Sequence, residues 1–167
     1  MKIHSKLPDV GVTIFIVMSK LSSDHNAINL SQGFPDFDVH PDLLTLVEKY
    51  MRSGYNQYAP MQGVLELREK IADKTLELYN ASYDPASEIT VTSGATEALF
   101  AAISAVVRKG DEVIVLEPAF DSYVPVIQLN GGIPVFVKYQ FPDYRIDWDD
   151  VKQAVTSKTK LIILNSP

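Results

Sequence analysis

The stretch "VIVLEPAFDSYVPVIQLNGGIPVFV" (residues 113–137) decides the fold class of this chain. Two short apolar runs, 113–116 and 133–137, flank a helical segment at 122–129 that ends at the turn "NGG". A continuous apolar run is typical of a strand covered on both faces, and a helix between two such runs is typical of a parallel sheet. This strand–helix–strand unit therefore predicts an α/β fold.

The same alternation extends in both directions from this unit. Strands are predicted at 88–92 ("EITVT") and 160–164 ("KLIIL"), and helices at 96–108 and 149–155. Three further helices are predicted in the N-terminal half, at 14–21, 40–54 and 62–80. We expect a three-layer α/β sandwich in which helices cover both faces of a largely parallel, mixed sheet.

Residues that favour turns are densest in "SQGFPDFDVHP" (31–41), the one plausible domain boundary in the chain. It separates an N-terminal arm and small-domain segment, residues 1–36, from an α/β body that begins at residue 37 and runs to residue 167.

Composition excludes several classes of function. The 167 residues are 46% hydrophobic and 22% charged, with a formal net charge of −6 and no cysteine. The charge and the absence of a basic run argue against nucleic-acid binding, and the absence of cysteine excludes disulfides and thiolate zinc sites. The longest apolar stretch, 10–18, is too short to span a bilayer. We expect a cytoplasmic protein without a metal or a membrane partner.

Chemistry in a parallel sheet collects beyond the carboxyl ends of the strands. The segments that follow the predicted strands are "SGAT" (93–96), "EPAFDSY" (117–123) and "NSP" (165–167). We therefore look for a binding site among these three segments.

The segment "SGAT" predicts a phosphate cradle. Gly94 permits a tight turn, and the N–H groups near Ala95 and Thr96 lie at the positive end of the predicted helix. The alternative is local capping, with Ser93 or Thr96 as the N-cap and Glu97 complementing the helix dipole.

Aromatic residues mark two further candidates. Phe120 follows a strand, where its ring can stack on a planar heterocycle or pack under the loop. The segment "GYNQYAPMQG" (54–63) either contacts a ligand or another subunit, or is an ordinary loop. The chain contains neither G-x-G-x-x-G nor G-x-x-x-x-G-K-[ST], which weakens nucleotide-binding interpretations.

Five stretches occur in an order that resembles the class I aminotransferases of pyridoxal-phosphate fold type I, closest to the methionine and kynurenine aminotransferase branch. They are "INLSQGFPDFD" (28–38), "NQYAPMQGVLELREKIA" (56–72), "ITVTSGATEAL" (89–99), "GDEVIVLEPAFDSY" (110–123) and "LIILNSP" (161–167). The resemblance runs from about Lys6 to the last residue and implies that the α/β body is the first part of a domain that binds pyridoxal 5′-phosphate.

The resemblance also implies roles for individual residues. The cofactor phosphate falls on the turn formed by Gly94, Ala95 and Thr96, and the cofactor ring on Phe120 and Asn165. Two further residues fall at the substrate: Gly33 beside its carboxylate and Phe15 in its side-chain pocket. Tyr58 would reach the phosphate from a neighbouring subunit, which implies a homodimer.

The implied activity is ping-pong transamination between a hydrophobic or sulfur-containing amino acid and a 2-oxo acid, with the cofactor as electron sink. The sequence ends inside the family's N-x-P-x-N-P motif, ahead of the Schiff-base lysine, so we expect a truncated chain that is inactive alone. The same scaffold leaves a carbon–sulfur β-lyase or a non-catalytic interaction subunit as alternatives.

Overall fold

The computed structural model describes residues 4–33 and 35–165. The chain divides into two compact units, one made of Met1–Val17 with Ser93–Pro167 and the other of Met18–Thr92. Each unit is described by itself below. The predicted domain boundary at residues 36 and 37 stays a prediction.

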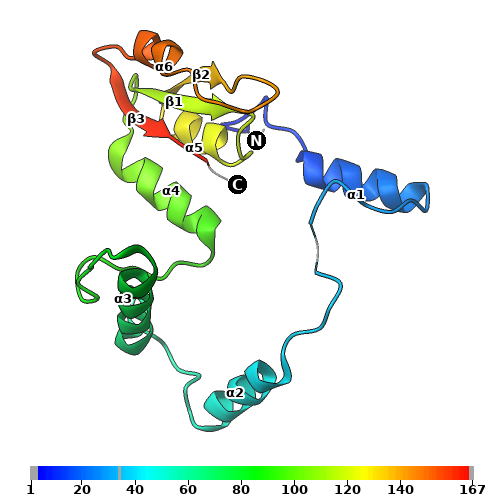
Figure 1. The fold of residues 1–167 in the computed structure, drawn as a ribbon, viewed down its shortest axis with the longest axis vertical. Helices are drawn as coiled ribbons and strands as arrows, with labels where there is room; N and C mark the ends of the chain where they lie inside the picture. Colours follow the sequence, from blue (N-terminus) through cyan, green and yellow to red (C-terminus); the bar gives the residue numbers. More distant parts are fainter. Residues whose placement is uncertain (1–3, 34, 166–167) are drawn as a thin grey trace. The chain divides into compact units, whose positions relative to one another are not determined.

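The first unit is built on a parallel sheet (Figure 1). Its strands are β1 (Glu112–Glu117), β2 (Ile133–Lys138) and β3 (Thr159–Ile163), and their order is β2-β1-β3. β1 pairs in parallel with both neighbours, so that Ile114 lies opposite Val135 and Ile162. The predicted α/β class with a parallel sheet is confirmed.

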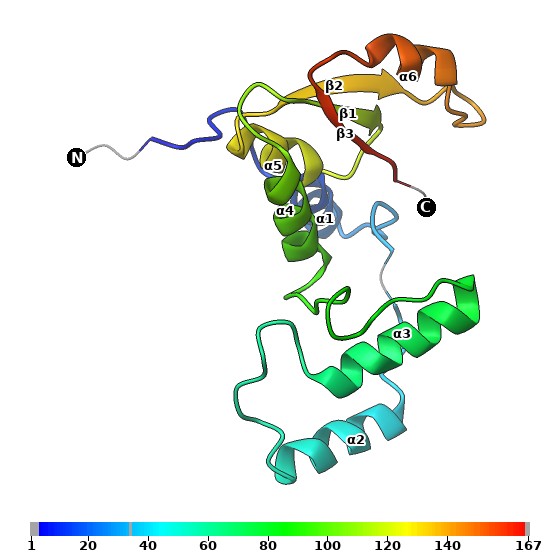
Figure 2. The same cartoon turned by 90° about the vertical axis from the view of Figure 1, so that its left-hand side faces the viewer.

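Side chains of β1 point alternately to the two faces of the sheet and contribute to the core on both. Val113 and Val115 pack against α4 (Ala95–Val106) and α5 (Tyr123–Leu129). Ile114 and Leu116 pack on the opposite face, against α6 (Trp148–Ala154). Figure 2 shows the three layers, with α6 on one side of the sheet and α4 and α5 on the other. Since successive strand residues point to opposite faces, one buried run serves two layers.

The second unit contains two helices, α2 (Pro41–Arg52) and α3 (Leu65–Tyr79). Pro41 is the first residue of α2, where its missing N–H is not needed, and Nδ1 of His40 accepts a hydrogen bond from the Asp42 N–H at 3.3 Å. A further helix, α1 (Ile14–Asp24), begins in the first unit and ends in the second. All three were predicted to within a few residues.

The predicted strand at 88–92 is wrong. These residues belong to no strand of the described sheet, and the Val91 N–H donates instead to the carbonyl of Gln62 at 2.9 Å. A strand exists only through hydrogen bonds to a neighbouring strand, and the sheet of the described residues consists of β2, β1 and β3 alone.

Candidate functional site

The first part of the site is the N-terminus of α4. Gly94 is its N-cap, with φ 87° and ψ 166° and no side-chain capping hydrogen bond. A Cβ atom added at Gly94 would meet nothing within 4 Å, so the space beside this turn is open. The first residues of the helix, Ala95 and Thr96, are exposed. A helix N-terminus in open space presents N–H donors and a positive dipole end to an anion.

Local capping is realised only in part at this turn. Neither Ser93 nor Thr96 is the N-cap of α4. The Glu97 carboxylate does accept a hydrogen bond from the Ser93 N–H, and this contact complements the helix end as the alternative foresaw. An anion bound at this turn would therefore be a neighbour of the Glu97 carboxylate.

Packing brings the N-terminal half of α4 toward the loop that follows β1. Leu99, just past the first turn of α4, packs against the core cluster that Tyr123 helps to form and against which Ala119 also packs. Ala119 belongs to the segment "EPAFDSY". The segment 117–123 and the helix that follows the segment 93–96 are therefore anchored to one cluster.

The second part of the site is a chain of contacts between Phe120, Tyr123 and Asn165. Phe120 is 38% exposed, and its ring meets that of Tyr123 edge to face, with centroids 5.7 Å apart and planes at 74°. The buried Tyr123 donates its phenol O–H to Oδ1 of Asn165 at 3.1 Å. The phenyl ring and the amide, predicted from segments after different strands, are thus linked through one tyrosine.

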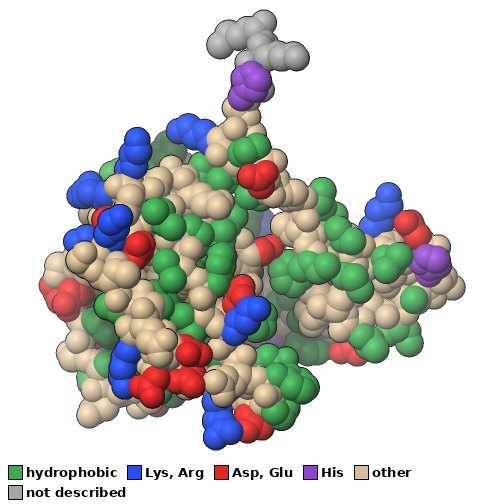
Figure 3. Space-filling view, turned by 90° about the horizontal axis from the view of Figure 1, so that it is seen from above, with side chains coloured by type: hydrophobic (Ala, Val, Ile, Leu, Met, Phe, Trp, Pro, Cys, Tyr) green, Lys and Arg blue, Asp and Glu red, His purple; other side chains and the backbone are tan. Residues whose placement is uncertain are grey.

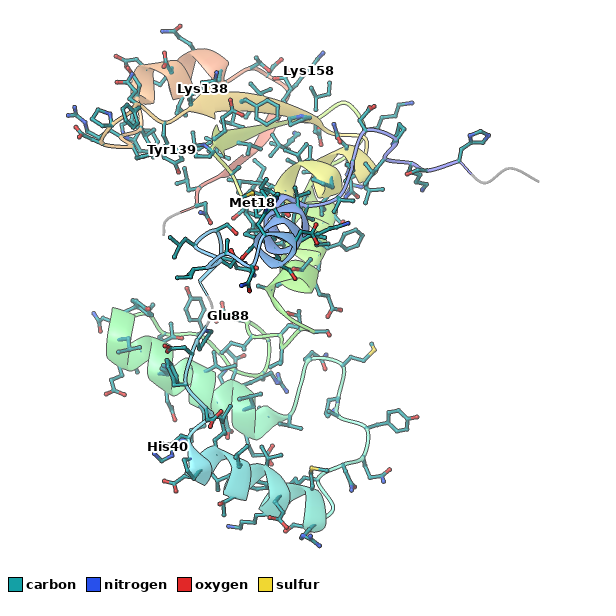
Figure 4. The ribbon with its side chains drawn as sticks, turned by 90° about the vertical axis from the view of Figure 1, so that its right-hand side faces the viewer. Met18, His40, Glu88, Lys138, Tyr139 and Lys158 are labelled. Carbon is teal, nitrogen blue, oxygen red and sulfur yellow. The ribbon has the colours of Figure 1, made fainter. Side chains whose placement is uncertain are left out.

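A second tyrosine reaches Asn165 from β2. Tyr139, the residue after β2 (Figure 4), donates its O–H to the main-chain carbonyl of Asn165 at 2.9 Å. A cavity of about 770 Å³ lies beside this bond, and Pro118, Tyr139, Leu164 and Asn165 are among the residues that line it. These four follow the carboxyl ends of all three strands, where parallel sheets place their ligands.

Three predicted residues lie outside this cluster. Tyr58 and Gly33 belong to the second unit, where Tyr58 is fully exposed and a Cβ at Gly33 would meet nothing within 4 Å. Phe15 is in the first turn of α1 and 36% exposed. Their proposed roles stay predictions. Of the segment 165–167, only Asn165 lies within the described residues.

The sequence did not single out Tyr123 and Tyr139, which the structure adds to the site. Tyr123 stands inside the quoted segment 117–123, and Tyr139 follows a predicted strand directly. Their position after a strand could therefore have marked both tyrosines as candidates. That both phenols bind Asn165 could not be predicted, because Asn165 lies 42 residues from Tyr123 and 26 residues from Tyr139 along the chain.

The described part of the chain contains neither a candidate metal site nor a candidate membrane span. Within residues 4–33 and 35–165, no three His, Cys, Asp or Glu side chains are grouped so that they could bind a metal ion. None of the helices in this described part combines the length and the hydropathy of a membrane span.

Comparison with known proteins gives consistent matches. The family described as aminotransferase class I and II matches residues 25–167. Methionine aminotransferase of Escherichia coli K12 is 53% identical over 164 residues, covering 98% of this chain and 42% of the relative. Kynurenine–oxoglutarate transaminase of Dictyostelium discoideum is 36% identical over 176 residues, covering 94% of this chain and 40% of the relative.

A solved structure shares the fold. The crystal structure of an Escherichia coli protein identified as a methionine aminotransferase matches with a TM-score of 0.92 and 51% identity, over 97% of this chain and 42% of the other. This chain therefore spans about two fifths of the length of the relatives it matches.

Proposed function

Because this chain belongs to the aminotransferase class I and II family, we propose that the full-length protein transfers an amino group from a hydrophobic or sulfur-containing amino acid to a 2-oxo acid. The names of the relatives, a methionine aminotransferase and a kynurenine–oxoglutarate transaminase, support this choice of substrates. We further propose that the protein acts in the cytoplasm as a homodimer.

The proposed cofactor is pyridoxal 5′-phosphate, and the described groups fit its two ends. A phosphate matches the exposed N-terminus of α4, where the N–H groups of Ala95 and Thr96 would bind it. A planar ring matches the half-exposed Phe120 and the Asn165 amide. When bound, this cofactor withdraws electrons from the α-carbon of the amino acid.

The chain's own residues would bind and orient rather than react. In the proposal, the start of α4 neutralises the phosphate and Phe120 covers one face of the ring and excludes water from it. Asn165 donates from its amide, and Gly33 and Phe15 lie at the substrate carboxylate and side chain. Tyr58 is assigned to the phosphate site of the neighbouring subunit.

The observation that carries the proposal is the start of α4. A glycine N-cap with φ 87° and open space beside it lets an anion approach the first N–H groups of the helix. The contacts among Phe120, Tyr123 and Asn165 within the same unit support the proposed place of the cofactor ring.

The decisive experiment is the intact mass of every polypeptide in the purified protein, before and after borohydride reduction with pyridoxal phosphate. We expect a polypeptide heavier than 18.6 kDa that contains this sequence and whose mass increases by that of the reduced cofactor. A single polypeptide of 18.6 kDa without an adduct would contradict the proposal and favour a non-catalytic interaction subunit.

The reaction type is tested by its products. With methionine or kynurenine as donor and a 2-oxo acid as acceptor, we expect a new amino acid to form from the acceptor. A second incubation distinguishes transamination from β-elimination. It contains a sulfur amino acid with a leaving group at its β-carbon and no acceptor, and release of pyruvate and ammonia would indicate a β-lyase.

A further inference from the structure

We infer that Tyr123 and Tyr139 are positioning residues that together hold Asn165 with its amide N–H2 group directed to the bound cofactor. This inference rests on the proposed function, since it concerns how one proposed cofactor ligand is oriented. It adds two residues to the site that lie outside the set predicted from the sequence.

Tyr123 is placed to control the side chain of Asn165. It is only 6% exposed and belongs to the core cluster under the sheet, so its ring has little freedom to move. Its O–H donates to Oδ1 of Asn165 at 3.1 Å, while its ring and that of Phe120 pack edge to face with centroids 5.7 Å apart. One rigid side chain therefore relates the ring of Phe120 to the amide of Asn165.

Tyr139 is placed to control the backbone of Asn165. It is partly buried against the opposite core cluster, and its O–H donates to the Asn165 main-chain oxygen at 2.9 Å. Asn165 lies two residues beyond the end of β3, where the ladder to β1 no longer holds the chain. The two tyrosines, anchored on opposite faces of the sheet, substitute for that ladder.

The chemical consequence follows from the asymmetry of an amide. An asparagine side chain has an acceptor oxygen and an N–H2 donor group, which lie in one plane and point in different directions from the amide carbon. Because Oδ1 faces the phenol of Tyr123, the N–H2 group faces the other way and acts as a donor. A fixed donor suits an acceptor on the cofactor ring, whereas a freely rotating amide would present its oxygen part of the time and repel such an acceptor.

The test uses the full-length enzyme and variants that each remove one phenol oxygen, Tyr123→Phe and Tyr139→Phe. The matched control is Tyr79→Phe, since Tyr79 is an exposed phenol at the end of α3 and has no part in the proposed site. The readouts are the dissociation constant of pyridoxal phosphate from the apoenzyme and the pH midpoint of the bound cofactor's absorbance.

We expect each tyrosine variant to raise the dissociation constant about 3-fold to 10-fold, the effect of one lost hydrogen bond. We also expect the pH midpoint to rise, because a less well-held N–H donor stabilises an anionic ring oxygen less. The control should leave both values unchanged. Tyrosine variants that behave like the control would overturn the inference.

A second pair of variants separates positioning from mere packing. In an Asn165→Ala background, Tyr123→Phe should have no further effect on the dissociation constant, because its action runs through the missing amide. An undiminished effect would overturn the inference even if the single variants behave as expected. If Tyr123→Phe does not fold, the same cycle with the less buried Tyr139 decides.

Failure of the proposed function looks different from failure of this inference. A wild-type protein that does not bind pyridoxal phosphate contradicts both. A wild-type protein that binds it, with tyrosine variants that bind it equally well, contradicts the positioning role alone.

Discussion

At the scale of single residues, Arg68 is the buried charge that organises the second unit. Its side chain is 8% exposed, and its guanidinium donates to the carbonyls of Gly63 at 3.2 Å, Pro85 at 2.6 Å and Ala86 at 3.2 Å. A guanidinium holds several N–H donors in one plane and therefore suits such a set of carbonyl acceptors. The ammonium group of a lysine is a compact point charge and does not match this set. Arg68 therefore ties the start of α3 to the loop that follows α3.

We expect Arg68→Lys to lower the free energy of unfolding of the full-length protein by about 2 kcal/mol, because buried carbonyls lose their donors. Denaturant titration measures this value. The control is Arg52→Lys, whose exposed side chain pairs with Glu48 at 2.9 Å, and it should leave stability unchanged. Equal effects of the two substitutions would show that Arg68 is no special anchor.

Asp84 supplies a pH-dependent contact in the same loop. The Ser87 hydroxyl, then the Ala86 N–H and the charge of Arg68, lower the pKa of its carboxyl. A lowered pKa in the folded state stabilises the fold above the unfolded pKa, and this contribution is lost as pH falls through the folded pKa.

We expect Ser87→Ala to raise the pKa of Asp84 toward its ordinary value, as measured by carboxyl NMR titration. The loss of stability caused by Ser87→Ala should be present at neutral pH and disappear in acid, where Asp84 is protonated in both proteins. A Ser87→Ala protein with the same Asp84 titration as wild type would refute this assignment.

At the scale of elements, the turn into α4 combines a backbone requirement with a proposed binding role. Gly94 has φ 87°, a value that residues with a Cβ rarely adopt, and the space beside it is open. Gly110, in the turn before β1, has φ 88° and equally open space. The two glycines therefore share a positive φ, but only Gly94 begins a helix in the proposed site.

We expect Gly94→Ala and Gly110→Ala each to cost about 1 kcal/mol of stability or more, because both place an alanine at a positive φ. Only Gly94→Ala should also weaken binding of pyridoxal phosphate by the full-length protein, since it alters the backbone that would hold the phosphate. Thermal unfolding and cofactor titration measure the two effects. Equal cofactor affinity in both variants would show that the phosphate does not bind at this turn.

At the scale of the whole molecule, the chain leaves much apolar surface uncovered. α1 and α2 bury no residue, and on α2 Leu43, Leu44 and Val47 are 54%, 58% and 50% exposed. Hydrophobic side chains are visible among the charged ones in the space-filling view (Figure 3). β2 and β3 are edge strands of the described sheet. Surfaces of this kind associate with others in water.

We expect the 167-residue chain, produced alone, to bind a hydrophobic dye such as anilinonaphthalene sulfonate and to self-associate. The full-length protein should not bind the dye and should not associate beyond the proposed homodimer. Dye fluorescence and sedimentation velocity measure both. A monomeric isolated chain that does not bind the dye would show that these surfaces need no cover.

The candidate site was predictable where it depended on local chemistry. Gly94 and the start of α4 follow from a glycine ahead of an apolar helical pattern, and Phe120 from its place after a strand. The role of Tyr123 and Tyr139 was not predictable, because their common target follows a third strand. Pairing across the sheet is what brings these distant residues together.

The sequence by itself determined where the helices and the three strands lie, because amphipathic period, proline and glycine signals act over a few neighbouring residues. Tertiary structure alone decided that β1 is central, that 88–92 forms no strand, and that two phenols converge on Asn165. The physical reason is that strand pairing and side-chain hydrogen bonds join residues distant along the chain, whose meeting depends on the packing of all the elements between them.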